Sequence, residues 1–128
     1  MEDIEFQPLI AKLGLSRVKI QPLPYYISVY FPDAYFSQGK MFMREMAEYF
    51  DGATACNGFN GMWKSPDKAI IAEDIFLIKA YTDLQSIHKH LENLIKSVCY
   101  WGRVCNQKVM AIEIGSIIGS TLLLIPID

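Results

Sequence analysis

The spacing of hydrophobic residues switches between two periods along the chain, and each switch predicts an element boundary. Residues 25–31 are almost all β-branched or aromatic, a composition that favours a strand. Alternation gives this strand two different faces, with Ile27, Val29 and Phe31 on one and Tyr26, Ser28 and Tyr30 on the other. Strand patterns also cover four later segments: 53–63, 69–81, 108–114 and 121–125.

Two segments have the helical period. Residues 37–50 place apolar side chains at helical spacing, with Ser37 as the expected N-cap. Thr82 and Gln85 form a capping-box pattern, which predicts that the second helix begins there and ends near Gly102.

The order of these elements predicts the fold. Strand, helix, strand, turn, strand, helix, strand is the order of the ferredoxin-like split βαβ sandwich, an α+β fold in which two helices cover one face of an antiparallel sheet. We expect one domain, with a core over residues 25–114, an N-terminal extension over 1–24 and an extra C-terminal strand within 115–128. In the extension, the pattern predicts a short helix over 8–13 and a short strand over 18–21.

The composition restricts the partners. Apolar residues make up 52% of the 128, against 20% charged residues. A domain of this size cannot bury so many apolar side chains, so we expect a homo-oligomer, a dimer or higher. The net charge of −2 and the scattered basic residues argue against nucleic acid as a partner.

The chain start and the cysteines predict a cytoplasmic protein. The start Met1-Glu2-Asp3 is acidic, unlike a signal peptide. The most apolar stretch, 114–127, is too short and too broken by Gly and Pro to span a bilayer, so no membrane partner is expected. Three cysteines, Cys56, Cys99 and Cys105, have no C-x-x-C spacing, which is typical of free thiols in a reducing compartment.

The stretch NGFNGMWKSP at 57–66 has two interpretations. It lacks the spacings of phosphate-binding loops and precedes a strand rather than a helix. It is therefore either a bulged or bent strand, with Trp63 as a mostly buried packing anchor, or the rim of a pocket.

This part of the chain also carries a resemblance. Asp51-Gly52-Ala53-Thr54, then Gly61-Met62-Trp63, then Glu73 resemble the D-G-x-T, G-x-W, E pattern of a small uncharacterised bacterial domain family. Members of that family are thought to be ferredoxin-like. The resemblance spans residues 51–73 and implies the fold, but no chemistry.

Alternation along the strands gathers polar residues on the sheet face away from the helices. Carboxylates on a partly apolar face can act as general acids or bases, but they can equally be solvated rim residues or polar contacts in a dimer interface. Glu73 is the candidate catalytic residue, and it should lie within hydrogen-bond reach of Tyr30 if this face lines a cavity. The ligand-binding candidates are Tyr26, Ser28, Tyr30, Trp63 and Glu113.

Asp74 lies on the opposite strand face from Glu73, and the two histidines lie on the second predicted helix. The same alternation turns Asp74 toward the helices, and a bulge near Glu73-Asp74 would spare it an unpaired buried charge. His88 and His90 are two residues apart on a helix and do not face each other, so no metal site is expected. No motif indicates a cofactor.

Three functions are compatible with the sequence. The first is an oligomeric module that binds a small ligand or a protein partner, and the alternative is a small cofactor-free enzyme acting on an apolar or aromatic small molecule. An intracellular structural component is a third reading. A closed cavity with converging polar groups would favour the enzyme, and a flat, dry sheet contact would favour the module.

Overall fold

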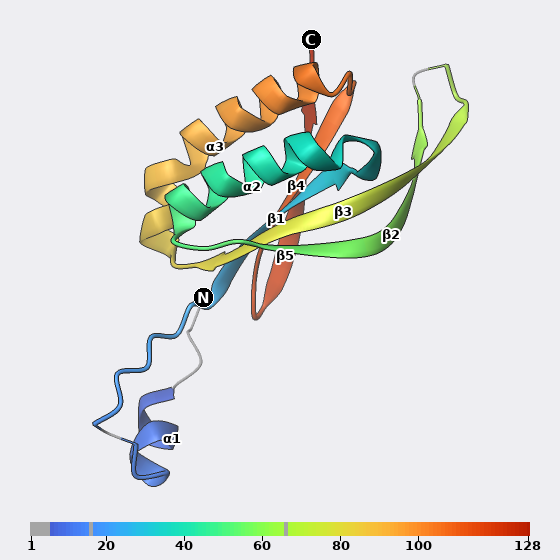
Figure 1. Cartoon of the computed structure of the whole chain (residues 1–128). Coiled ribbons are helices and arrows are strands. Elements are labelled where there is room, and N and C mark those ends of the chain that lie inside the picture. The colour runs from blue at the N-terminus through green and yellow to red at the C-terminus, as the bar shows by residue number, and fades with distance from the viewer. Residues whose placement is uncertain (1–5, 16, 66) are drawn as a thin grey trace.

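Five strands pair antiparallel in the order β2-β3-β1-β4-β5, and helices α2 and α3 cover one face of this sheet (Figure 1). The computed structural model describes residues 6–15, 17–65 and 67–128. Its elements are α1 (Phe6–Lys12), β1 (Tyr25–Pro32), the 3-10 turn η1 (Asp33–Tyr35), α2 (Phe36–Phe50), β2 (Thr54–Lys64), β3 (Ile70–Thr82), α3 (Leu84–Val104), β4 (Val109–Ser116) and β5 (Gly119–Pro126). The predicted α+β class is confirmed: β1 to β4 and the two helices follow the ferredoxin-like connectivity, and β5 extends the edge beside β4.

The core lies between the sheet and the two helices. The face of β1 predicted to be apolar, formed by Ile27, Val29 and Phe31, is fully buried there. Phe76 of β3 packs against Phe31, with ring centroids 5.5 Å apart. Gly39 lets α2 come this close, because a Cβ atom at that position would collide with the Phe76 ring.

Both predicted helix caps are wrong. Helix α2 has no side-chain cap from Ser37, because η1 leads directly into it and places Tyr35 at the N-cap position. Helix α3 is capped by Asp83, whose carboxylate accepts a hydrogen bond of 2.7 Å from the backbone N–H of Ser86. Thr82 instead ends β3, where its pairing with β1 continues the sheet.

The bulge predicted for the glycine-rich stretch is confirmed. The pairing of β2 with β3 shifts between Cys56 and Phe59, where Gly58 has a φ of 88°. The β2–β3 hairpin then runs on past Pro32, the last residue of β1, without a strand beside it (Figure 1). Asp74 lies in this overhang and is exposed, so the bulge expected at Asp74 itself is absent and no buried partner is needed.

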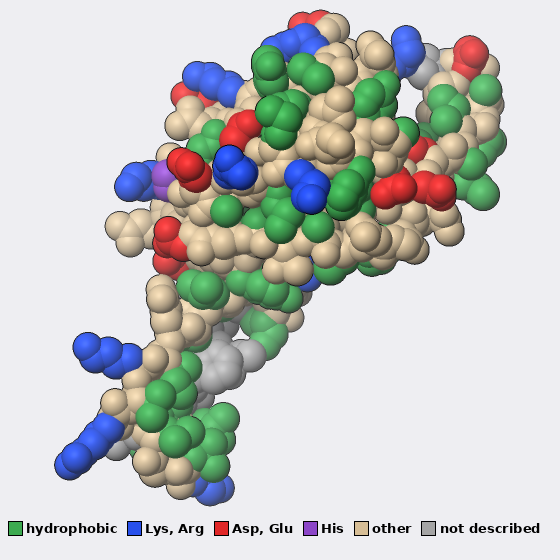
Figure 2. Space-filling model, viewed as in Figure 1, with side chains coloured by type: hydrophobic (Ala, Val, Ile, Leu, Met, Phe, Trp, Pro, Cys, Tyr) green, Lys and Arg blue, Asp and Glu red, His purple; other side chains and the backbone are tan. Residues whose placement is uncertain are grey.

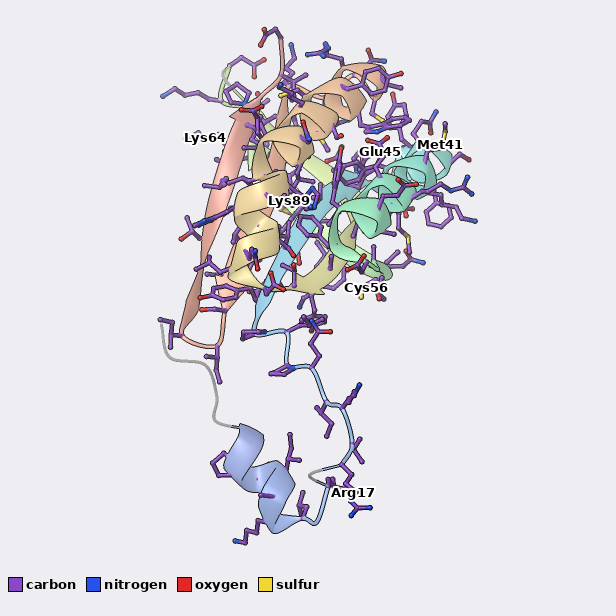
Figure 3. The ribbon with its side chains drawn as sticks, turned by 90° about the vertical axis from the view of Figure 1, so that its left-hand side faces the viewer. Arg17, Met41, Glu45, Cys56, Lys64 and Lys89 are labelled. Carbon is purple, nitrogen blue, oxygen red and sulfur yellow. The ribbon has the colours of Figure 1, made fainter. Side chains whose placement is uncertain are left out.

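Of the described part of the N-terminal extension, helix α1 stands away from the sheet in both views (Figures 1 and 3). The short helix predicted over 8–13 is present as α1, and Gly14, with a φ of 72°, follows it. The strand predicted over 18–21 is wrong, because these residues have no strand edge to pair with. No helix in the described ranges is long and apolar enough to cross a bilayer.

Candidate functional site

Tyr26, Tyr30 and Glu113 form a hydrogen-bonded cluster on the sheet face opposite the helices, which we call the open face. The Tyr26 hydroxyl donates to Oε2 of Glu113 at 2.6 Å, and the Tyr30 hydroxyl donates to Oε1 at 3.0 Å. The pairing of β1 with β4 explains this geometry. It sets Glu113 directly opposite Ser28, so that the two tyrosines flank the carboxylate from either side along β1.

The cluster favours the ionised carboxylate. The hydrogen bond from Tyr26 lowers the pKa of Glu113, and the bond from Tyr30 acts in the same direction. The same bond to Glu113 raises the pKa of Tyr26, and burial raises the pKa of Tyr30. At neutral pH the cluster is therefore one fixed carboxylate with two neutral phenols as donors.

Two further residues hold the Tyr26 ring in place. Gly115 lies opposite Tyr26 in the β1–β4 pair, and a Cβ atom at Gly115 would collide with the phenol ring. Lys79, opposite Ser28 on β3, has its Nζ atom 4.3 Å from the centre of the Tyr26 ring. Tyr26 therefore lies between a glycine that admits its ring and a cation attracted by the ring.

A hollow of about 330 Å³ opens beside Tyr26 at the end of the sheet. Its walls come from the segment before β1, from β3 and from the β4–β5 turn. The lining residues are Pro22, Leu23, Pro24, Tyr26, Lys79, Tyr81, Ser116 and Ile117. The hollow thus combines apolar walls with one cation, and it shares Tyr26 with the cluster.

A larger groove of about 500 Å³ runs over the helices. Met41 and Glu45 line it from α2 (Figure 3), together with Lys40, Arg44, Glu48, Tyr49 and, from α3, Trp101. Glu45 already accepts a hydrogen bond of 2.7 Å from the Trp101 indole. The groove is bordered by long charged side chains of mixed sign (Figure 2).

Glu73 and Trp63 lie apart from the cluster. The Trp63 indole donates to Oε1 of Glu73 at 3.2 Å, and its ring covers Gly61, which is opposite Glu73. Glu73 makes no hydrogen bond to Tyr30 within the described chain, because it lies in the overhanging part of the hairpin, beyond the end of β1. Trp63 is half-buried and outside the core, so it is not the core anchor that we expected.

The structure therefore brings Tyr26, Ser28, Tyr30 and Glu113 together and leaves Glu73 and Trp63 as a separate pair. Sequence reasoning missed Lys79, Tyr81 and Gly115. The alternation of β3 could have indicated Lys79 and Tyr81, whereas Gly115 has no sequence signal without the strand register. No group of three or more potential metal ligands occurs among the described residues.

Comparison with known proteins shows the fold and leaves the family open. No protein-family model and no curated protein matches this chain. A phage SAM lyase in complex with S-methyl-5'-thioadenosine is similar, with a TM-score of 0.62 and 8% identity, over 84% of this chain and 93% of that one. A phage SAM lyase in the apo state has a TM-score of 0.62 and 11% identity, over 86% and 97%. The likeness covers nearly the whole of those proteins and, at this identity, shows the fold alone.

The cluster predicts a pH dependence of stability. The pKa of Glu113 is lower in the folded chain than in the unfolded chain. Ionised Glu113 therefore adds to the free energy of unfolding above about pH 4.3, the ordinary pKa of a glutamate. This stabilisation is lost as the pH falls through the pKa that Glu113 has in the folded chain. Urea unfolding at several pH values should therefore show a steeper loss of stability in acid for the natural chain than for Glu113→Gln. Equal slopes for both proteins would contradict the hydrogen-bonded carboxylate.

Proposed function

We propose that this protein binds a small molecule on its open face, against Tyr26, Tyr30 and Glu113. The observation that carries the proposal is the ionised carboxylate fixed by two phenol donors beside an apolar hollow. An oriented charge with aromatic side chains around it is typical of ligand sites and is costly to maintain without a use. The location we propose is the cytosol, where an exposed thiol such as Cys56 stays reduced.

The ligand class that we propose is an adenosine sulfonium or thioether, such as S-adenosylmethionine or S-methyl-5'-thioadenosine. The similar fold of a phage SAM lyase bound to the second compound supports this choice. The chemistry of the open face supports it as well. A purine can stack on the tyrosine rings, and a sulfonium cation is attracted by the Glu113 carboxylate and by aromatic faces. Lys79 would pair with the carboxylate that only S-adenosylmethionine carries.

An enzymatic role is the second candidate, because the proteins of similar fold are lyases. Conversion of S-adenosylmethionine into S-methyl-5'-thioadenosine breaks the bond between the sulfonium sulfur and the aminobutyrate carbon, and the electron pair of that bond stays on sulfur. The substrate's own carboxylate oxygen would form the new bond to that carbon, so that the four-carbon fragment leaves as a lactone. Glu113 would then stabilise the cation before cleavage. Chromatography of S-adenosylmethionine incubated with the protein would reveal S-methyl-5'-thioadenosine above the spontaneous background if this role is correct.

Calorimetric titration tests the binding proposal. Both compounds should give saturable heats with the natural chain, and adenosine without the sulfur substituent should bind more weakly. Glu45→Gln is the matched control on the helix groove, and it should bind like the natural chain. The absence of heat with both compounds at millimolar concentration would refute the proposed ligand class.

A further inference from the structure

The N-terminal extension has the properties of a docking segment. We define the arm as residues 8–15 and 17–21, before the segment that lines the hollow. Five of its aliphatic side chains are exposed: Leu9, Leu13, Leu15, Val18 and Ile20. Helix α1 has no extensive contact with any other helix or strand of the described chain. Figure 2 shows its hydrophobic side chains gathered at the far end of the molecule, away from the sheet.

A helix as short as α1 is not stable by itself. It spans 7 residues, whereas isolated helices below about 12–15 residues are marginal in water. The hydrogen bonds from Leu15 N–H to the Ile10 carbonyl and from Val18 N–H to the Leu15 carbonyl close a compact helix–turn unit. Such a unit stays folded when its apolar residues pack against a surface, and the chain's own sheet does not provide that surface.

The open face offers an uncovered surface of matching character. Beside the cluster, three side chains of β4 and β5 form what we call the apolar flank: Val109, Leu122 and Leu124. All three are exposed, and Glu113, opposite Leu122, borders them with its negative charge. The arm has a complementary charge, because it contains Lys12, Arg17 and Lys19 and no acidic residue.

The prolines direct the arm away from its own sheet. Pro22 and Pro24 restrict Gln21 and Leu23 to extended conformations, so the chain leaves β1 on a stiff path. In both views the arm continues outward rather than folding back over the sheet (Figures 1 and 3). A segment that extends away from its own apolar flank can reach the same flank on a second copy.

We infer that the arm of each chain docks on the apolar flank of a second copy, which gives a reciprocal, arm-exchanged dimer. The interface is isologous, since each chain supplies one arm and one flank. The dimer therefore contains two identical arm–flank contacts, and each contact buries one arm and one apolar flank. It goes beyond ligand binding and does not depend on the ligand. It also accounts for the apolar excess of the sequence.

Light scattering of full-length variants tests the exchange. Leu13 in the arm, Leu124 in the flank and Met41 on α2 are each 60% exposed, so glutamate at any of them should leave the fold of one chain intact. The natural chain should have about twice the mass of one 14.6 kDa chain. Leu13→Glu and Leu124→Glu should each weaken the dimer by at least about tenfold, because each buries an unpaired charge. Met41→Glu should not weaken it, and circular dichroism should be unchanged in all three variants.

Mixing two variants distinguishes exchange from other arrangements. Leu13→Glu chains and Leu124→Lys chains should each be monomeric alone. Together they should form a dimer, which keeps one natural arm–flank contact and gains one contact of opposite charges. A monomeric natural chain would overturn the inference, as would a dimer that tolerates Leu13→Glu. A mixture that stays monomeric would do the same, since arm-to-arm pairing or docking within one chain gives no complementation.

Discussion

Replacing Phe76 with alanine is expected to lower the free energy of unfolding by about 3–5 kcal/mol, the cost of deleting a fully buried aromatic ring. Phe76 connects the sheet with the first covering helix. Its ring lies 5.5 Å from the Phe31 ring and 5.2 Å from the Phe36 ring, and it fills the space that Gly39 leaves open. No neighbour can collapse into that space without moving α2, so the cavity term should be large.

Urea unfolding monitored by circular dichroism measures this effect. Met62→Ala is the matched control, because Met62 is 75% exposed on the overhanging hairpin. It should change the free energy of unfolding by less than about 0.5 kcal/mol. A loss below about 1 kcal/mol for Phe76→Ala would show that the helices do not pack on the sheet as described.

Replacing Glu113 with glutamine is expected to weaken ligand binding by about 10- to 150-fold, with the fold intact. Hydrogen bonds to charged groups contribute about 1.5–3 kcal/mol, and this range corresponds to that loss of affinity. The amide keeps the size of the side chain but removes the charge that Tyr26 and Tyr30 orient. A cationic sulfonium should be affected more than a neutral thioether, since only the sulfonium loses an attraction between charges.

Glu73→Gln provides the control for this substitution. Glu73 is bonded to Trp63 in the hairpin overhang and lies outside the cluster, so its amide should bind either compound like the natural chain. Calorimetric titration of both variants separates the two carboxylates. If Glu73→Gln loses binding and Glu113→Gln does not, the site belongs to the hairpin and not to the cluster.

Glu73 and Glu113 show which parts of the candidate site can be predicted from the sequence. Alternation correctly predicts which face of the sheet a residue occupies, and it placed Glu113, Tyr26 and Tyr30 on the open face. It does not give the position along the strand. β3 has 13 residues and β1 only 8, so Glu73 lies past the end of its neighbour and cannot meet Tyr30. Strand register is a tertiary property, and it decides which polar groups converge.

The N-cap of α3 and the burial of Trp63 were also decided by tertiary structure. Thr82 and Asp83 are both residue types that favour the N-cap position. Thr82 pairs with β1 as the last residue of β3, so the helix begins one residue later and Asp83 is the cap. Trp63 is a large aromatic residue of the kind that often packs in a core, but the hairpin extends beyond the helices that would have buried it. The bulge at Gly58 was predictable, since a glycine inside a strand pattern indicates a local backbone conformation.

The most direct test of the proposed open-face site is an NMR titration of the isotope-labelled protein with S-methyl-5'-thioadenosine. We expect the largest shifts for the backbone amides of Ser28, Tyr30 and Glu113, which lie on adjacent strands of the open face. The chemical shift of the Trp101 indole N–H, which donates a hydrogen bond to Glu45 in the helix groove, should not change. If the largest shifts occur at that indole and in α2 while the amides of the open face do not shift, the proposed ligand site on the open face is wrong.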